Sequence, residues 1–135
     1  MMKLRVLLWI VALSQLVLGT FTLLFPTQFF VLMGLTAPPA DNKYMLGMLS
    51  ARFIAYGLAF VALARAEIPD PRWIRNMVLI QLIDFGAGLY YVLTGVIGFG
   101  IAGFPMFNAA LFATLLWLWQ PNASSNRGEV SALQS

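Results

Sequence analysis

Four long runs of apolar residues, separated by short polar or proline-containing segments, make up most of the chain. They cover roughly residues 4–25, 44–64, 74–97 and 104–119. A helix needs about 20 mostly apolar residues to cross the hydrocarbon core of a bilayer. The fourth run is the shortest and reaches that length only with help from its flanks. The pattern predicts an all-α fold, an integral membrane four-helix bundle formed by residues 1–120.

The composition supports a membrane protein rather than a soluble domain. Hydrophobic residues make up 61% of the chain and charged residues 10%, whereas soluble domains carry about 25% charged residues. The first apolar run is longer than the ~7–15 residues of a signal-peptide core. We therefore expect it to be retained as a helix.

The basic residues are distributed unevenly around the apolar runs. Only Lys43 lies in the segments expected on one side of the membrane, and the others fall on the opposite side: Lys3, Arg5, Arg65, Arg72, Arg75 and Arg127. Because basic loops stay in the cytoplasm, we expect both termini to be cytoplasmic. The segment 121–135 is rich in Ser and Asn, and we expect it to form a disordered polar tail.

Cysteine and histidine are both absent from the chain. This excludes disulfides, thiol redox chemistry, Cys/His zinc sites, His-ligated haem and histidine acid–base catalysis. We predict no metal site and no cofactor. Nucleic acid is not an expected partner, because the net charge of +3 lies mostly in loops where it sets membrane orientation.

Two charged residues interrupt the apolar runs. Arg52 lies ~12 Å into the second run from its outer end, and Asp84 lies ~15 Å into the third run from its inner end, at 1.5 Å per residue. In a core ~30 Å thick, the two depths differ by ~3 Å. A charge at this depth costs at least ~2.5–3.5 kcal/mol. We therefore predict that the two helices form a tight antiparallel pair and that Arg52 and Asp84 form a buried ion pair.

Small and polar residues recur at helical spacing around these charges. The candidate polar core comprises Arg52, Asp84, Gln81, Tyr91, Gln15 and Asn108. Three interpretations remain open. The charge pair can be a structural lock that fixes helix register, the polar core can bind a ligand, proton or substrate, or one charge can lie nearer the surface and extend its side chain to water.

The sequence Gly98–Gly103 matches the GxGxxG pattern of dinucleotide-binding proteins. That motif requires a preceding strand, a following helix and an acidic residue about 20 positions later. Here the segment follows an expected apolar helix instead of a strand, and no acidic residue comes after it until Glu129. We expect a flexible hairpin at this point, with Pro105 at the start of the fourth helix.

In layout, the chain resembles the DoxX-like group of small four-helix bacterial membrane proteins, including the BphX-like members. Three segments carry the resemblance: NKYMLGMLSARFIAYGLAFVALA (42–64), DFGAGLYYVLTG (84–95) and FPMFNAALF (104–112). It implies a multi-pass protein of the cell inner membrane. DoxX-like proteins of redox pathways would imply quinone or thiol partners. Because the chain lacks cysteine and matches no catalytic motif, only fold and location are transferred.

The sequence leaves the function open between classes. One hypothesis is a non-enzymatic accessory or interaction protein, whose partner beyond the lipid bilayer is another membrane protein or a second copy of the chain. The alternative is a binder or carrier of a small lipophilic molecule, a quinone or a proton, which uses the polar core around Arg52 and Asp84. An enzyme with Asp84 as acid or base is less favoured, because no second carboxylate, His or Cys lies in the apolar runs.

Overall fold

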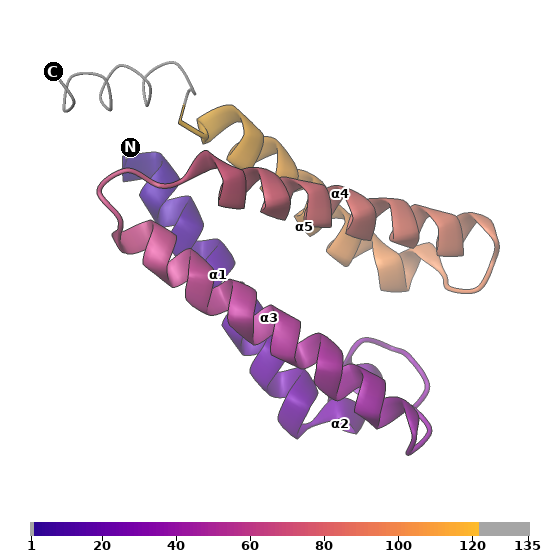
Figure 1. Ribbon diagram of the computed structural model, residues 1–135. Coiled ribbons are helices and arrows are strands. Elements are labelled where there is room, and N and C mark those ends of the chain that lie inside the picture. Colours follow the sequence, from indigo (N-terminus) through magenta and orange to yellow (C-terminus); the bar gives the residue numbers. More distant parts are fainter. Residues whose placement is uncertain (1, 122–135) are drawn as a thin grey trace, which may run out of the picture.

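The computed structural model describes residues 2–121, and these form five α-helices without a strand (Figure 1). The helices are α1 (Met2–Leu24), α2 (Pro26–Leu32), α3 (Asn42–Arg65), α4 (Pro71–Leu93) and α5 (Phe99–Trp119). All but the short α2 are long and apolar enough to cross a membrane. The all-helical class and its four long apolar helices are thus confirmed. Most of the predicted polar tail, residues 122–135, lies outside the described residues.

The ends of several helices follow from local sequence. Asp70 precedes α4 in an extended conformation and accepts a hydrogen bond from the Arg72 amide at 2.9 Å, and Pro71 begins the helix. Helices α2 and α4 both end in a glycine turn, with Gly34 at φ 81° and Gly95 at φ 77°. Positive φ is a conformation that glycine adopts without strain. These turns define where the helices stop.

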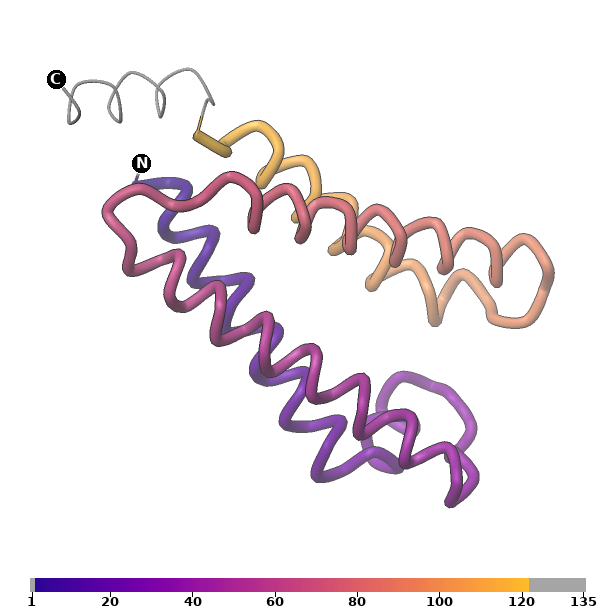
Figure 2. The backbone as a smooth tube through the Cα atoms, in the orientation of Figure 1, coloured from indigo at the N-terminus to yellow at the C-terminus, as the bar shows by residue number. Residues whose placement is uncertain are grey.

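The long helices pack as two hairpins, α1 with α3 and α4 with α5 (Figure 2). Glycine allows the close approach within each hairpin. A Cβ at Gly57 would lie 2.6 Å from Leu16 Cγ and 3.1 Å from the Leu16 backbone nitrogen. The backbone of α3 at Gly57 therefore lies directly against Leu16 of α1. A Cβ at Gly88 would lie 2.7 Å from Met106 Cγ.

The two hairpins meet at one end of the molecule and diverge toward the other (Figures 1 and 2). We call the first the closed end; it contains the α3–α4 loop and the halves of the four long helices next to it. Large side chains with less than 2% exposure fill it: Leu8, Val11, Phe60, Ile74, Met77 and Leu116. They belong to one hydrophobic cluster with members from all four long helices. The hairpins are therefore held together mainly at this end.

The predicted tight pairing of the second and third long helices is wrong. Helix α3 packs along α1, and α4 packs along α5. Helices α3 and α4 meet only near their connecting loop, where the rings of Tyr56 and Trp73 contact edge to face with centroids 6.1 Å apart. The loop bends the chain through extended residues such as Ala66 and Asp70 (ψ 146° and 118°), so α4 leaves in a direction that diverges from α3.

The boundary predicted for the last helix is also wrong. Helix α5 begins at Phe99, with Gly98 as the residue before it, so the GxGxxG segment lies in its first turns instead of in a flexible hairpin. Pro105 is inside the helix. Gly100 and Gly103 lie within α5 and do not interrupt it.

Candidate functional site

A cleft of about 730 Å³ lies between the two hairpins, where they diverge. Side chains from all five helices line it, together with the turn that follows α2 and the segment between α4 and α5. The cleft exists because the closed end is filled by large side chains, whereas the facing helix surfaces beyond it do not meet. We call the other end of the molecule, where the cleft lies, the open end.

Both hairpins contribute polar side chains to the cleft, and we call these side chains the polar strip. Five of the six residues proposed from the sequence line the cleft: Gln15, Gln81, Asp84, Tyr91 and Asn108. They come from three helices. The α4 members are spaced at three and seven positions, which puts them on one face of that helix. The sequence pattern therefore located most of the polar residues of this cleft, although their role in binding stays a prediction.

The depth of these residues differs along the strip. Gln15 and Gln81 are buried, with 8% and 5% exposure, and the Gln81 amide donates a hydrogen bond to Met77 Sδ at 3.4 Å. Asp84 is exposed, and Tyr91 keeps 46% of its surface accessible. Among the described residues, no fully buried side-chain nitrogen or oxygen lacks a partner. Polar groups without an internal partner thus remain reachable from the cleft or the surface.

The rest of the wall is apolar and rich in aromatic rings. Phe21, Phe29, Phe53 and Phe112 line the cleft from four different helices. Phe29 packs edge to face against Phe21, with ring centroids 5.7 Å apart, which joins α2 to α1. An apolar wall with a few convergent polar groups is typical of small-molecule sites.

Segments of both hairpins approach each other at the rim of the cleft. The residues after α2 lie on one side, and Ile97 and Ile101 lie on the other. A Cβ at Gly34 would lie 3.6 Å from Ile101 Cγ1, an ordinary contact distance. The turn after α2 therefore reaches from the α1–α3 hairpin to the start of α5.

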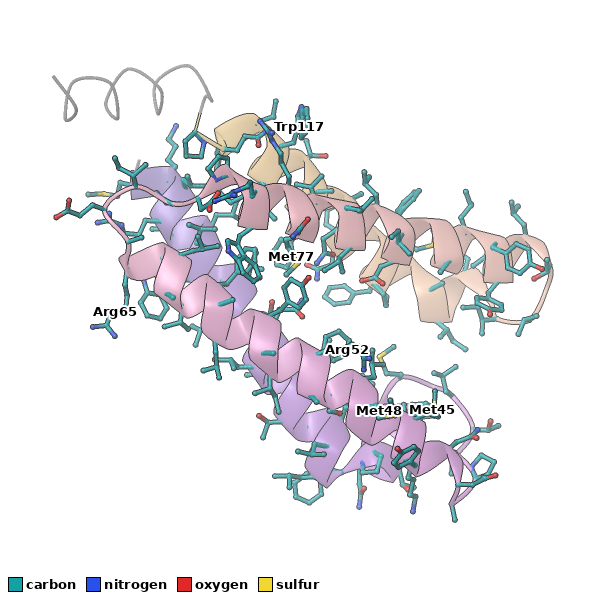
Figure 3. All side chains as sticks on the ribbon, in the orientation of Figure 1. Met45, Met48, Arg52, Arg65, Met77 and Trp117 are labelled. Carbon is teal, nitrogen blue, oxygen red and sulfur yellow. The ribbon has the colours of Figure 1, made fainter. Side chains whose placement is uncertain are left out.

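The predicted ion pair between Arg52 and Asp84 is wrong in this structure. Within residues 2–121, the one ion pair joins Asp70 and Arg72, at 3.0 Å. Arg52 is exposed, does not line the cleft, and donates from its guanidinium to the Met48 carbonyl at 3.0 Å. Figure 3 shows Arg52 near Met48 on the half of α3 away from the closed end. The pair does not form because α3 and α4 have already diverged at these positions.

Sequence reasoning missed the cleft itself and its aromatic wall. Phe21, Phe29, Phe53 and Phe112 belong to apolar runs in which every helix face is hydrophobic, so periodicity did not single them out. The apolar segment after the first run was a signal, because α2 forms there and lines the cleft. Its proline at the first position marks the start of that helix.

The polar groups of the site can form hydrogen bonds with a bound molecule. These groups are amides, a phenol and a carboxylate, with the Ser14 hydroxyl donating to the Val11 carbonyl at 2.8 Å. No cluster of three or more His, Cys, Asp or Glu residues occurs in the described part of the chain. Comparison of the chain with family models, curated proteins and solved structures gave no match.

Proposed function

We propose that this chain is a multi-pass protein of the cell inner membrane, of the DoxX-like kind, that binds a small lipophilic molecule in the cleft between its hairpins. The observation that carries the proposal is the cleft of about 730 Å³, which combines an aromatic wall with a strip of amide, phenol and carboxylate groups. Such a site binds the apolar body of a ligand by contact and orients its polar group by hydrogen bonds.

The membrane location rests on the surface of the four long helices. Many large apolar side chains are more than half exposed, among them Leu79, Leu82 and Ile83 on α4 and Trp117 on α5. In water such a surface would cause association, whereas in a bilayer it contacts lipid tails. These helices therefore suit a bilayer better than water.

The orientation rests on the basic residues. Lys3, Arg5, Arg65, Arg72 and Arg75 all belong to helix segments or loops at the closed end. By the positive-inside rule, this end and both termini are cytoplasmic. The open end then faces the opposite side of the membrane, so a ligand enters from the outer half of the bilayer.

The same cleft favours a binding function over a purely accessory or structural role and over an enzymatic role. An accessory protein needs no internal space, and a pure structural role would predict a filled centre around the polar residues. A catalytic role needs a second acid or base beside Asp84, and among the described residues that line the cleft there is no other carboxylate and no His, Cys, Lys or Arg. The chemistry of the lining therefore supports binding without turnover.

The test uses the purified chain in phosphatidylcholine nanodiscs and triphenylphosphine oxide, a neutral lipophilic probe whose single polar oxygen accepts hydrogen bonds. We expect saturable binding above the partitioning measured in empty nanodiscs. The variant Ser14→Trp places a large ring in the cleft and should abolish this binding.

A matched control is Thr114→Trp on α5. Thr114 is exposed, does not line the cleft, and its hydroxyl bonds to the Ala110 carbonyl at 2.8 Å much as Ser14 bonds to Val11. Both variants lose a hydroxyl–backbone bond and gain an indole. Thr114→Trp should bind the probe like the original chain. Absent saturation, or equal binding by both variants, would overturn the proposed function.

A further inference from the structure

The ligand class follows from the charge of the cleft, and this inference rests on the proposed function. Asp84 is the one charged residue among those lining the cleft. No Lys or Arg among residues 2–121 lines it. We propose that the cleft binds lipophilic cations, with the Asp84 carboxylate as the counter-charge.

Asp84 is available to such a ligand. Its side chain is accessible, and no ion pair to it forms within the described residues. The nearest candidate from the sequence, Arg52, donates to the Met48 carbonyl and stands outside the lining. A carboxylate in apolar surroundings carries an unfavourable desolvation energy unless a positive charge approaches it. An incoming cation supplies that charge.

The aromatic wall suits a cation as well. Phe21, Phe29, Phe53 and Tyr91 line the cleft together with Asp84. The face of an aromatic ring attracts a cation, by about 0.5–1 kcal/mol at exposed sites and more where water is excluded. An anion gains nothing from the same ring faces. The aromatic walls and the carboxylate therefore both favour a positively charged ligand.

The α5 side of the cleft adds neutral acceptors. Pro105 has no N–H, so it donates nothing to the carbonyl of Ile101 one turn earlier, and both residues line the cleft. The side-chain oxygen of Asn108 lies on the same helix, one turn further on. Carbonyl and amide oxygens stabilise a positive charge by their dipoles. They add acceptors for a cation to the negative charge of Asp84.

The experiment compares three probes of similar size in phosphatidylcholine nanodiscs: tetraphenylphosphonium, a cation; tetraphenylborate, an anion; and neutral triphenylphosphine oxide. Equilibrium dialysis against empty nanodiscs removes the contribution of the lipid. We expect tetraphenylphosphonium to bind at least about tenfold more tightly than tetraphenylborate, as expected for one charge-assisted contact. Equal affinity for the two ions would overturn the inference.

The variant Asp84→Asn keeps the size of the side chain and removes its charge. It should weaken tetraphenylphosphonium binding at least about tenfold and weaken triphenylphosphine oxide binding by a clearly smaller factor, because the neutral probe makes no charge contact with the carboxylate. Asp41→Asn is the matched control, because Asp41 is exposed just before α3 and does not line the cleft. Asp84→Glu keeps the charge and should keep the preference for the cation.

The outcomes separate this inference from the proposed function. If the neutral probe binds but the two ions bind equally, or if Asp84→Asn binds the cation normally, the ligand class is wrong and the binding function stands. If none of the three probes shows saturable binding, the proposed function fails and the ligand class fails with it. The comparison of the two ions uses the unmodified chain, so it stays decisive even where a variant does not fold.

Discussion

The closed and open ends of this molecule are built from the same four long helices, yet they differ in how those helices meet. At the closed end, Leu8, Phe60, Ile74 and Leu116 interlock with almost no exposed surface. At the open end, the facing surfaces present glutamines, a carboxylate and partly exposed aromatic rings around the cleft. One end supplies cohesion and the other supplies a site.

The difference shows that helix pairing in this chain depends on shape more than on charge. Glycines at 19 and 57 let α1 and α3 approach within side-chain contact, and bulky residues fill the junction of the hairpins. In lipid, packing of this kind is the main force between helices. The opposite charges of Arg52 and Asp84 do not overcome it.

The largest expected effect comes from cysteine pairs that report which helices are neighbours. The chain has no native cysteine. A Cβ at Gly19 would lie 3.0 Å from Phe53 Cβ, near the ~3.5–4.5 Å of disulfides. Gly19→Cys with Phe53→Cys should therefore oxidise readily, once the Ile54 side chain moves and the two helices separate by a few tenths of an ångström, because the Ile54 backbone nitrogen also lies 3.1 Å from this Cβ. Arg52→Cys with Asp84→Cys should stay reduced under the same brief oxidation.

Blocking of free thiols followed by intact mass measurement scores both pairs in nanodiscs. Each single-cysteine variant is the control for disulfides between molecules. Rapid, complete oxidation of the Arg52→Cys, Asp84→Cys pair would mean that the open end is closed in the bilayer. The contrast between the two ends would then disappear.

The next largest effect is the loss of unfolding free energy when either of two phenylalanines of α3 is replaced, one at the closed end and one at the open end. Phe60 has no exposed surface, so Phe60→Ala should cost about 3–5 kcal/mol of unfolding free energy. Phe53 lines the cleft and is only partly buried, so Phe53→Ala should cost no more than about half as much. Unfolding of the helices in mixed micelles by added sodium dodecyl sulfate, followed by circular dichroism, measures both. Equal losses would show that the open end contributes as much cohesion as the closed end.

The sequence predicted the long helices and most of the polar strip, but not how the helices pair. Runs of apolar residues report helix length directly, and spacing placed Gln81, Asp84 and Tyr91 on one face of α4. Pairing depends on which surfaces fit in three dimensions. The short loop before α4 suggested a tight α3–α4 pair, but Gly57 against Leu16 and the extended residues of that loop produce a different arrangement. The cleft follows from that arrangement, so the apolar and polar patterns that mark its lining residues did not predict it.

The smallest expected effect concerns the acidic residues that precede α4 at the closed end and α3 at the open end. Asp70 has extended backbone angles and accepts from the Arg72 amide two positions on, as a helix cap does, whereas Asp41 is helical and accepts only from the adjacent Asn42 amide at 3.0 Å. Asp70→Ala should therefore cost about 1 kcal/mol, and Asp41→Ala clearly less, in the same detergent titration. Equal costs would remove this difference between the ends.

The pH dependence of stability separates two contributions of Asp70 to the free energy of unfolding: the charge of its carboxylate and the hydrogen bond by which it caps α4. The hydrogen bond from the Arg72 side chain, and then that from the Arg72 amide, hold the pKa of Asp70 below its ordinary value of 3.8. A lowered pKa in the folded chain means that the charge stabilises it fully above the ordinary pKa, and that this part is lost as the pH falls through the lowered value. The stability difference between the original chain and Asp70→Asn, which keeps a neutral capping oxygen, should be small at pH 7, because the pair lies at the surface with Asp70 34% and Arg72 86% exposed. The difference should vanish in strong acid. A difference that grows as the pH falls would show that Asp70 acts on the closed end by some route other than its contact with Arg72.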